Sequence, residues 1–279
     1  MNLPRCVALG TMHGKVAAIG PPLTRLGIAV DVPRGLDTDR FGTFTGEMPR
    51  PGTMEEAALA KARAASEASG LPVGIASEGS YAPHPALPLV PFGRELLLWH
   101  DGSSGQVIAE WHTDARPCFD QTDAAGPADA APFLERIGFP KTAVIVSPGG
   151  EKTKPLAKGV TDHAALEAAI TEAARLSRNG KAFLQTDMRA HLNPRRMSVI
   201  AALADRFAAR LACDCPSCGA PGWGRLRVET GLPCEWCEGP TALVAREVHG
   251  CTACGQTLRR TRPDGLERAD PGQCPACNP

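Results

Sequence analysis

The sequence lacks an excess of charge of either sign and lacks any long apolar run. Its 30 Lys and Arg side chains balance 30 Asp and Glu, so the formal net charge is zero. Whole-protein electrostatics therefore gives no argument for binding to nucleic acid or to a membrane surface. No apolar run approaches the roughly 20 residues that a helix needs to cross a bilayer, so we expect no integral membrane protein.

The first ten residues also lack the features of a signal peptide. They contain one arginine, a short apolar stretch and no small-residue cleavage site, so we expect a cytoplasmic protein. The chain has 29 Gly and 26 Pro among 279 residues, yet 43% of its residues are hydrophobic. This combination indicates a loop-rich globular protein and not a disordered one.

The most specific signal is the distribution of the 11 cysteines. Eight of them form four CxxC pairs near the C-terminus: Cys215 and Cys218, Cys234 and Cys237, Cys251 and Cys254, Cys274 and Cys277. The spacing between successive pairs is typical of four-cysteine zinc sites, in which two tight turns supply four thiolates. We therefore expect two structural zinc ions. Sequential pairing of the turns is the simplest arrangement, and an interleaved pairing is the alternative.

The cysteine-rich segment is small and rich in Gly and Pro, so zinc has to supply much of its folding free energy. We place a zinc-binding domain at residues 212–279 and a larger body at residues 1–211. The only locally basic stretch of the tail is residues 258–262. The alternatives for its role are structural support, docking of a protein partner, or contact with RNA.

The body shows strand and helix patterns in alternation. The sequence predicts a mixed, partly parallel α/β sheet with flanking helices, followed by a small double zinc-ribbon-like domain. A Thr53–Glu56 capping box predicts a helix start, and Asn193-Pro194 predicts another. The expected strands are 5–9, 27–32, 72–77, 94–100, 106–112, 142–146 and 181–186, and the expected helices include 53–69, 127–137, 162–178 and 194–211.

Three polar clusters lie where strands of the body are expected to end, the usual place for ligands in open α/β sheets. Thr11, His13 and Lys15 precede a short helix, and a hydroxyl, a cation and free backbone N–H groups there suit a phosphate. Glu78 follows the strand 72–77. With a flexible Gly beside it and a long proline-rich segment after it, we interpret Glu78 as a candidate Mg²⁺ ligand in a loop.

A third cluster lies between the strand 181–186 and the last helix of the body. We expect Asp187 to hold the metal, and Arg189, Arg195 and Arg196 to bind an anion. His191 is a candidate for proton transfer, and Asn193 a further contact to the ligand. Local capping and surface ion pairs are the alternative explanation for these residues.

The chain resembles an uncharacterised bacterial family that is defined only as a domain of unknown function. The resemblance covers most of the chain and implies no activity. It depends on five features: TMHGK, TDRFGTFTGEMPR, ASEGSYAPHP, TDMRAHLNPRRM and the CxxC tail.

The first 80 residues are also similar to the Maf and inosine-triphosphate pyrophosphatase superfamily. The matching positions are the loop from Thr11 to Lys15, the pair Lys61-Ala62 and the pair Glu78-Gly79. This resemblance implies that Lys15 contacts a triphosphate and Glu78 holds magnesium. The usual Asn of the first loop is replaced by His13-Gly14, the base-recognition motifs are absent as such, and the zinc tail is foreign to that superfamily.

Two hypotheses of function follow. In the first, the body is an Mg²⁺-dependent hydrolase of a nucleotide or another phosphorylated molecule, similar to nucleoside-triphosphate pyrophosphatases, with Glu78, Asp187 and His191 as catalytic residues. In the second, the protein is a non-catalytic module that binds a nucleotide and docks RNA or a partner through its tail. A different phosphotransfer or RNA-modifying enzyme is a third alternative.

Overall fold

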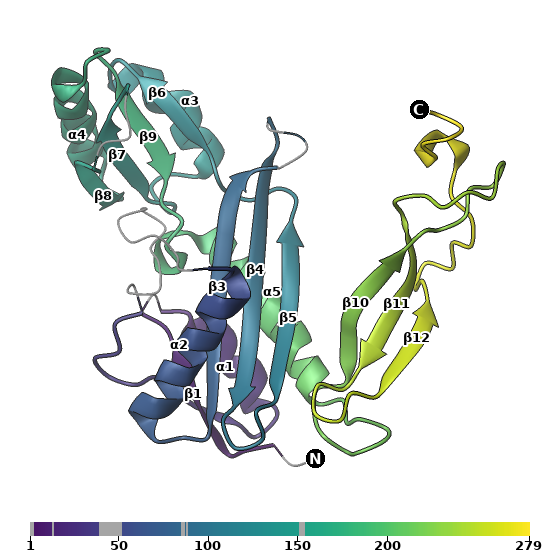
Figure 1. Ribbon diagram of the computed structural model, residues 1–279. Helices are drawn as coiled ribbons and strands as arrows, with labels where there is room; N and C mark the ends of the chain where they lie inside the picture. The colour runs from purple at the N-terminus through teal and green to yellow at the C-terminus, as the bar shows by residue number, and fades with distance from the viewer. Residues whose placement is uncertain (1–2, 13, 39–51, 85–86, 88, 151–153) are drawn as a thin grey trace. The chain divides into compact units, whose positions relative to one another are not determined.

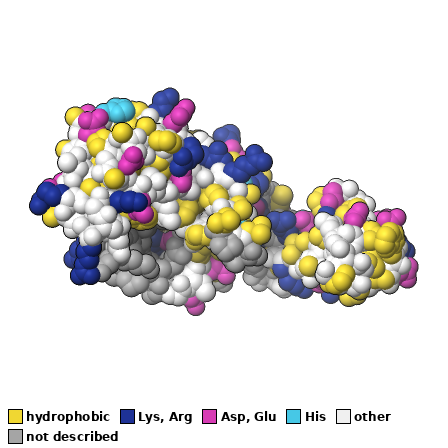
Figure 2. Space-filling view, turned by 90° about the horizontal axis from the view of Figure 1, so that it is seen from above, with side chains coloured by type: hydrophobic (Ala, Val, Ile, Leu, Met, Phe, Trp, Pro, Cys, Tyr) yellow, Lys and Arg dark blue, Asp and Glu magenta, His cyan; other side chains and the backbone are white. Residues whose placement is uncertain are grey.

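The computed structural model describes residues 3–12, 14–38, 52–84, 87, 89–150 and 154–279. The chain divides into two compact units. The larger unit consists of Pro4–Ser103 and Ala109–Phe207. The smaller unit consists mainly of Ala208–Pro279 and also includes Ser104–Ile108. Acidic and basic side chains are interspersed over the face of the molecule in Figure 2, in agreement with a net charge of zero.

A five-stranded mixed sheet forms the first part of the larger unit (Figure 1). Its strand order is β2-β1-β3-β4-β5, with β1 parallel to both neighbours and β3 antiparallel to β4. The mixed, partly parallel α/β architecture expected from the sequence is thus confirmed. The strands are β1 (Cys6–Gly10), β2 (Ala29–Asp31), β3 (Val73–Pro83), β4 (Pro91–Asp101) and β5 (Val107–Asp114).

Three helices flank this sheet: α1 (Val16–Thr24), α2 (Met54–Ser69) and α5 (Pro194–Leu211). Figure 1 shows α2 on one face and α1 and α5 on the other. The Thr53–Glu56 capping box starts α2 as expected, and Gly70 ends it in a left-handed conformation. A side chain at Gly74 of β3 would collide with the backbone of α2 at Ala62, so this glycine allows the helix to lie close to the sheet.

One expectation about this sheet is wrong. The segment Glu78-Gly79-Ser80 is not a loop after a strand but the middle of β3, which continues to Pro83. The reason is the partner strand: β4 pairs with β3 without interruption from Val73↔Asp101 to Pro83↔Pro91. This tertiary pairing supplies backbone hydrogen bonds that carry the strand through Gly79, where the local sequence indicates a turn.

The second part of the larger unit is a four-stranded sheet in the order β6-β9-β7-β8. Helices α3 (Pro127–Ile137) and α4 (His163–Leu176) contact one another and share one apolar core with this sheet. Every pairing in it is antiparallel, so the rule for ligand sites at the ends of parallel strands does not apply to β9. The strands are β6 (Gln121–Ala124), β7 (Val144–Pro148), β8 (Ala157–Val160) and β9 (Ala182–Thr186).

The smaller unit is built on a three-stranded antiparallel sheet, β10-β11-β12. These strands span Gly224–Thr230, Val244–Gly250 and Thr257–Thr261. A single turn of 3₁₀-helix, η3 (Pro271–Gln273), precedes the last CxxC turn. In the part of the chain that the structure describes, no helix has the length and apolar character needed to cross a membrane.

Candidate functional site

Lys15 lies in the larger unit, between the end of β1 and the start of α1, and its side chain is buried. Its ammonium group donates to the carbonyl oxygen of Ser77 at 3.1 Å and to the Ser77 hydroxyl at 3.2 Å. Strand β1 ends at Gly10, opposite Ala76 of β3. Lys15 therefore contacts β3 at Ser77, one residue beyond the part that pairs with β1. The first cluster predicted from sequence is therefore anchored to the second.

Two buried ion pairs lie near Lys15, on opposite faces of the β3–β4 ladder. On the face covered by α2, Lys61 forms an ion pair with Glu78. On the other face, Arg196 of α5 binds Glu95 of β4 through Nε at 2.6 Å and Nη2 at 3.4 Å. We call these five residues the buried charge cluster. It holds three cations and two carboxylates.

The Glu95–Arg196 pair is fixed by further contacts. Tyr81 donates its hydroxyl to Glu95 at 2.6 Å, and the Arg196 guanidinium lies 5.4 Å from the centre of the Tyr81 ring. Arg196 also donates to the carbonyl oxygen of Met188. A Cβ atom at Gly79 would lie 2.8 Å from the Glu95 carboxylate, so this position has to be a glycine. The pair is thus a rigid, fully buried element.

The charge cluster perturbs the protonation of Lys15. Burial, and after it the nearby Arg196 cation, lowers the pKa of Lys15 from 10.5 to about 7, although Glu95 and Glu78 act in the opposite direction. Each carboxylate of the cluster already has a cation of its own. Among the described residues, Lys15 has no carboxylate in ion-pair contact. It is the surplus positive charge of the cluster.

The residues of the third predicted cluster bind mainly one another. Asp187 is fully buried and accepts from the Arg189 backbone N–H at 3.0 Å and from the Arg189 guanidinium at 2.6 Å. Asn193 accepts from Arg196 N–H at 3.0 Å and so caps α5, as expected from the Asn193-Pro194 pair. Its amide donates to the carbonyl oxygens of Cys118 and Asp187 at 3.4 Å. Asp187 thus orients Arg189, and Asn193 fixes the start of α5.

The remaining candidates lie at the surface or outside the description. His191 is exposed in η2 (Ala190–Leu192), and its Cβ lies 3.7 Å from the position that a Cβ on Gly14 would take. The first and third clusters therefore approach each other. Arg195 is exposed and lies 4.0 Å from Asp114. Thr11 is partly exposed, whereas His13 and residues 39–50 of the TDRFGTFTGEMPR motif lie outside the described residues.

Sequence reasoning missed Glu95 altogether and gave Lys61 and Arg196 minor places. Glu95 is fully buried in β4, and a carboxylate at a core-facing position of the run Arg94-Glu95-Leu96-Leu97-Leu98 was the available signal. Its partner Arg196 lies 101 residues away along the chain. No local spacing connects the two.

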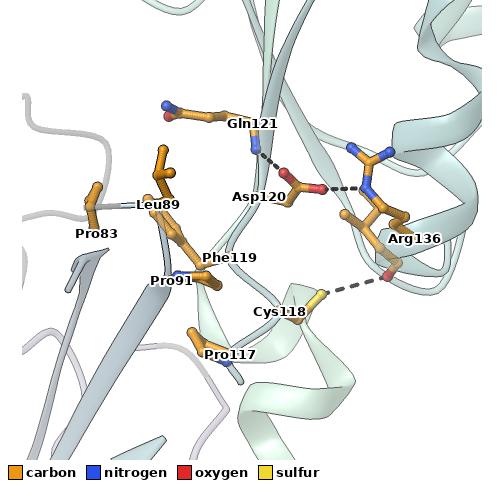
Figure 3. Close-up of a pocket in the computed structure, with 10 residues that line it drawn as sticks. Pro83, Leu89, Pro91, Pro117, Cys118, Phe119, Asp120, Gln121 and Arg136 are labelled. Carbon is orange, nitrogen blue, oxygen red and sulfur yellow. Dashed lines mark hydrogen bonds and ion pairs between the residues drawn. The ribbon is translucent and has the colours of Figure 1, made fainter. Parts of the chain in front are cut away.

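The larger unit also contains a pocket of about 420 Å³ beyond the far end of the β3–β4 ladder (Figure 3). Three prolines, Leu89, Phe119 and Ile137 form its apolar lining. Asp120 accepts from Arg136 Nε at 2.9 Å and provides a polar wall beside Gln121. Such a mixture of apolar surface and a few polar groups is typical of small-molecule pockets.

The cysteines of the smaller unit form two groups of four. Within each group, the sulfur atoms all lie within 4.8 Å of one another, and the closest pairs of separate turns are 3.6–3.9 Å apart. A tetrahedron with zinc–sulfur bonds of ~2.3 Å has edges of ~3.8 Å, so each group could hold a zinc ion. These separations are too long for disulfides.

The pairing of the CxxC turns is interleaved. One group combines Cys215 and Cys218 with Cys251 and Cys254, and the other combines Cys234 and Cys237 with Cys274 and Cys277. The antiparallel sheet explains why. Strand β10 carries the chain from the first turn to the second, and β11 brings it back to the third, so the first and third turns meet at one end of the sheet. Sequential pairing is thereby excluded.

A family model described as a domain of unknown function, DUF6671, matches residues 61–279. The match includes both cysteine groups and four of the five residues of the buried charge cluster, and Lys15 precedes it. No curated protein and no solved structure matches the chain.

Proposed function

The chain belongs to DUF6671, a family of unknown function, and from the geometry of its own residues we propose that its larger unit is an Mg²⁺-dependent hydrolase of nucleotides. The observation that carries the proposal is the buried charge cluster. It places one surplus cation, Lys15, beside two buried carboxylates at the end of β1. This is the position at which α/β sheets bind phosphorylated ligands.

A phosphate group would complete the surroundings of Lys15. An ammonium group has three N–H donors, and Ser77 accepts two of them. In this proposal, the third donor and the N-terminus of α1, with its partial positive charge, bind the phosphate. Because burial lowers the Lys15 pKa to about 7, the apo amine is readily neutral, and a bound phosphate would raise this pKa again.

Glu78 fits a role in holding magnesium together with the ligand. Among the described residues, only the cysteines form a group of three or more metal-binding side chains, so the protein by itself offers Mg²⁺ too few ligands. Magnesium is commonly held by one or two carboxylates plus substrate phosphates, and the buried Glu78 carboxylate supplies such a ligand. When bound, the ion would polarise the phosphoryl oxygens and lower the pKa of water.

The other residues of the cluster have separable roles. Lys15 binds a phosphate oxygen, and Lys61 holds the Glu78 carboxylate in place through their ion pair. Arg196 is held by Glu95 and supplies a fixed positive field for charge that develops on the leaving group. Arg189, oriented by Asp187, remains partly exposed and can reach an anion. His191 stays a candidate for proton transfer at the surface of the site.

The pocket of Figure 3 suits the nucleobase of the same ligand. Pro91 of the pocket and Glu95 of the charge cluster lie on one face of β4, because they are four positions apart along the strand. An extended strand rises ~3.3 Å per residue, which puts them ~13 Å apart. A nucleoside polyphosphate is long enough to place its phosphates near Lys15 and its base between the prolines and Phe119.

The test is release of phosphate or pyrophosphate from a panel of standard and deaminated nucleoside triphosphates, with and without Mg²⁺. We expect Mg²⁺-dependent turnover that Glu78→Gln abolishes and that Glu67→Gln, an exposed glutamate of α2, leaves unchanged. Thermal shift with the same nucleotides measures binding separately. Binding without turnover would refute the hydrolase and retain the binding module, and no binding would refute both.

For the smaller unit, we propose that each cysteine group holds one structural Zn²⁺. The unit has few large buried apolar residues, and the cysteines Cys215, Cys234, Cys251 and Cys274 are among its buried side chains. Closed four-thiolate sites supply folding free energy directly, on the order of 10 kcal/mol per ion. Two zinc ions per chain, counted by native mass spectrometry, are the expected result.

A further inference from the structure

The charges of the smaller unit are unevenly placed. From Cys213 onward the sequence has seven arginines, no lysine and eight acidic residues. Five of these arginines lie in the three strands, together with only two glutamates, Glu229 and Glu247. Five of the acidic residues lie in the segments that follow β10 and β12: Glu235, Glu238, Asp264, Glu267 and Asp270. Acidic and basic residues are therefore nearly equal in number over the whole tail, but the three strands carry an excess of positive charge.

One face of this sheet carries most of the excess positive charge. Val248 of β11 lies opposite Arg227 of β10 and opposite Arg259 of β12. Two residues before Val248, Arg246 of β11 lies opposite Glu229 of β10. Residues directly opposite in an antiparallel sheet share a face, as do residues two apart along a strand. Arg227, Arg246 and Arg259 thus lie on one face, which we call the arginine face.

The arginine face is open to solvent and incompletely neutralised. Glu229 accepts from Arg227 at 3.4 Å and from Arg259 at 3.1 Å, and both arginine side chains are more than half exposed. Arg246 has no ion-pair partner among the described residues. Three cations therefore surround a single carboxylate. Val248, at the centre of this face, is buried.

We propose that the arginine face binds single-stranded RNA. The planar guanidinium group binds phosphate with two parallel hydrogen bonds and also stacks on bases, which lysine does not do. Leu226 is partly exposed and lies over Gly250 of the same face, so an apolar contact for a base adjoins the cations. Cations on one open face of a sheet suit a single strand, whose bases and phosphates are both accessible.

A different explanation of these arginines is edge protection. Strands β10 and β12 are the two edges of the sheet, and charged side chains on edge strands prevent pairing with other chains. Under that explanation, Arg227 and Arg259 keep the protein monomeric and Arg246, on the central strand, has no role. The proposal requires Arg246 to contribute to binding as Arg259 does.

Fluorescence anisotropy of the full chain, loaded with zinc, tests the proposal. The probes are a labelled mixed-sequence RNA strand of roughly 20 nucleotides, the matching duplex and a polyglutamate peptide, each titrated at several salt concentrations. The logarithm of the affinity should fall with the logarithm of salt concentration with a slope of about −0.7 per contacted phosphate, or about −2 for three arginines. Tighter binding of the polyglutamate peptide or of the duplex would overturn the assignment.

Substitutions locate the surface. Arg246→Ala together with Arg259→Ala should lower the affinity for the single strand about tenfold or more and make the salt slope shallower by about 1.4. The control is Arg268→Ala, because Arg268 is comparably exposed but pairs with Glu238 outside the sheet. Zinc content verifies that each variant is folded. Equal losses in variant and control, or self-association of the double variant with unchanged RNA binding, would refute the proposal.

Discussion

Replacing Lys15 by methionine should stabilise the protein while removing the proposed phosphate site. The buried ammonium group is costly, since the shift of the Lys15 pKa from 10.5 to about 7 corresponds to about 5 kcal/mol when the group is charged. Methionine fills a similar volume without charge. It loses two hydrogen bonds to Ser77, each contributing about 1 kcal/mol. We therefore expect Lys15→Met to be more stable than the parent by roughly 2–3 kcal/mol at pH 6.5.

The pH dependence gives this prediction its sharpest form. Between the folded pKa of about 7 and the unfolded value of 10.5, the unfolded chain binds a proton at Lys15 that the folded chain does not. The stability of the parent therefore rises with pH across this window by about 1.4 kcal/mol per unit, and Lys15→Met lacks this rise. The advantage of the variant is greatest below pH 7 and shrinks by about 2.7 kcal/mol between pH 7 and pH 9.

Hydrogen–deuterium exchange of peptides from β3 is the suitable assay, because a chain of two units need not unfold in one step. Comparison of variant and parent at the same pH cancels the intrinsic pH dependence of exchange and the titration of other groups. The ratio of their exchange rates should change about tenfold per pH unit above pH 7. A ratio that does not vary with pH, or a variant less stable at pH 6.5, would refute the reasoning.

Two further predictions concern the cysteines and the buried ion pair. Cys218→Ser with Cys254→Ser should leave one zinc ion per chain by native mass spectrometry, because both residues belong to one group, whereas Cys218→Ser with Cys237→Ser should remove both ions. The reverse result would contradict the interleaved pairing. Glu95→Gln should destabilise the larger unit by about 3–5 kcal/mol, since it leaves the buried Arg196 cation without its counter-charge. Exchange from β4 measures this loss, and a change below about 1 kcal/mol would mean that water or another group compensates the cation.

The parts of the site that the sequence predicted depend on short spacings. Each CxxC turn places two sulfurs on one tight turn, so eight cysteines that could hold a metal are recognisable without any fold. The Thr53–Glu56 box and the Asn193 cap are likewise local, and the structure confirms both. Lys15 was singled out because it precedes a helix at the end of a strand, which is again a local feature.

The parts that the sequence could not provide depend on contacts between distant segments. Glu95 and Arg196 lie 101 residues apart along the chain, and only the packing of α5 on the β3–β4 ladder brings them together. Glu78 was expected in a loop and lies inside β3, because pairing with β4 overrides the local preference of Gly79 for a turn. Asp187 has the residue type of a metal ligand, but in the structure its carboxylate accepts hydrogen bonds from the backbone and side chain of Arg189.

By itself, the sequence determined which cysteines form CxxC turns that could hold a metal, which residues start the helices, and that strands and helices alternate in the body. These features follow from spacings of a few residues. The tertiary structure alone decided how the CxxC turns pair, since an antiparallel sheet returns the chain to the same end after every second strand. It also decided which charges of the body meet in one buried cluster, and which arginines of the tail share a face. Those outcomes depend on strand register and helix packing, to which residues far apart in the sequence contribute jointly.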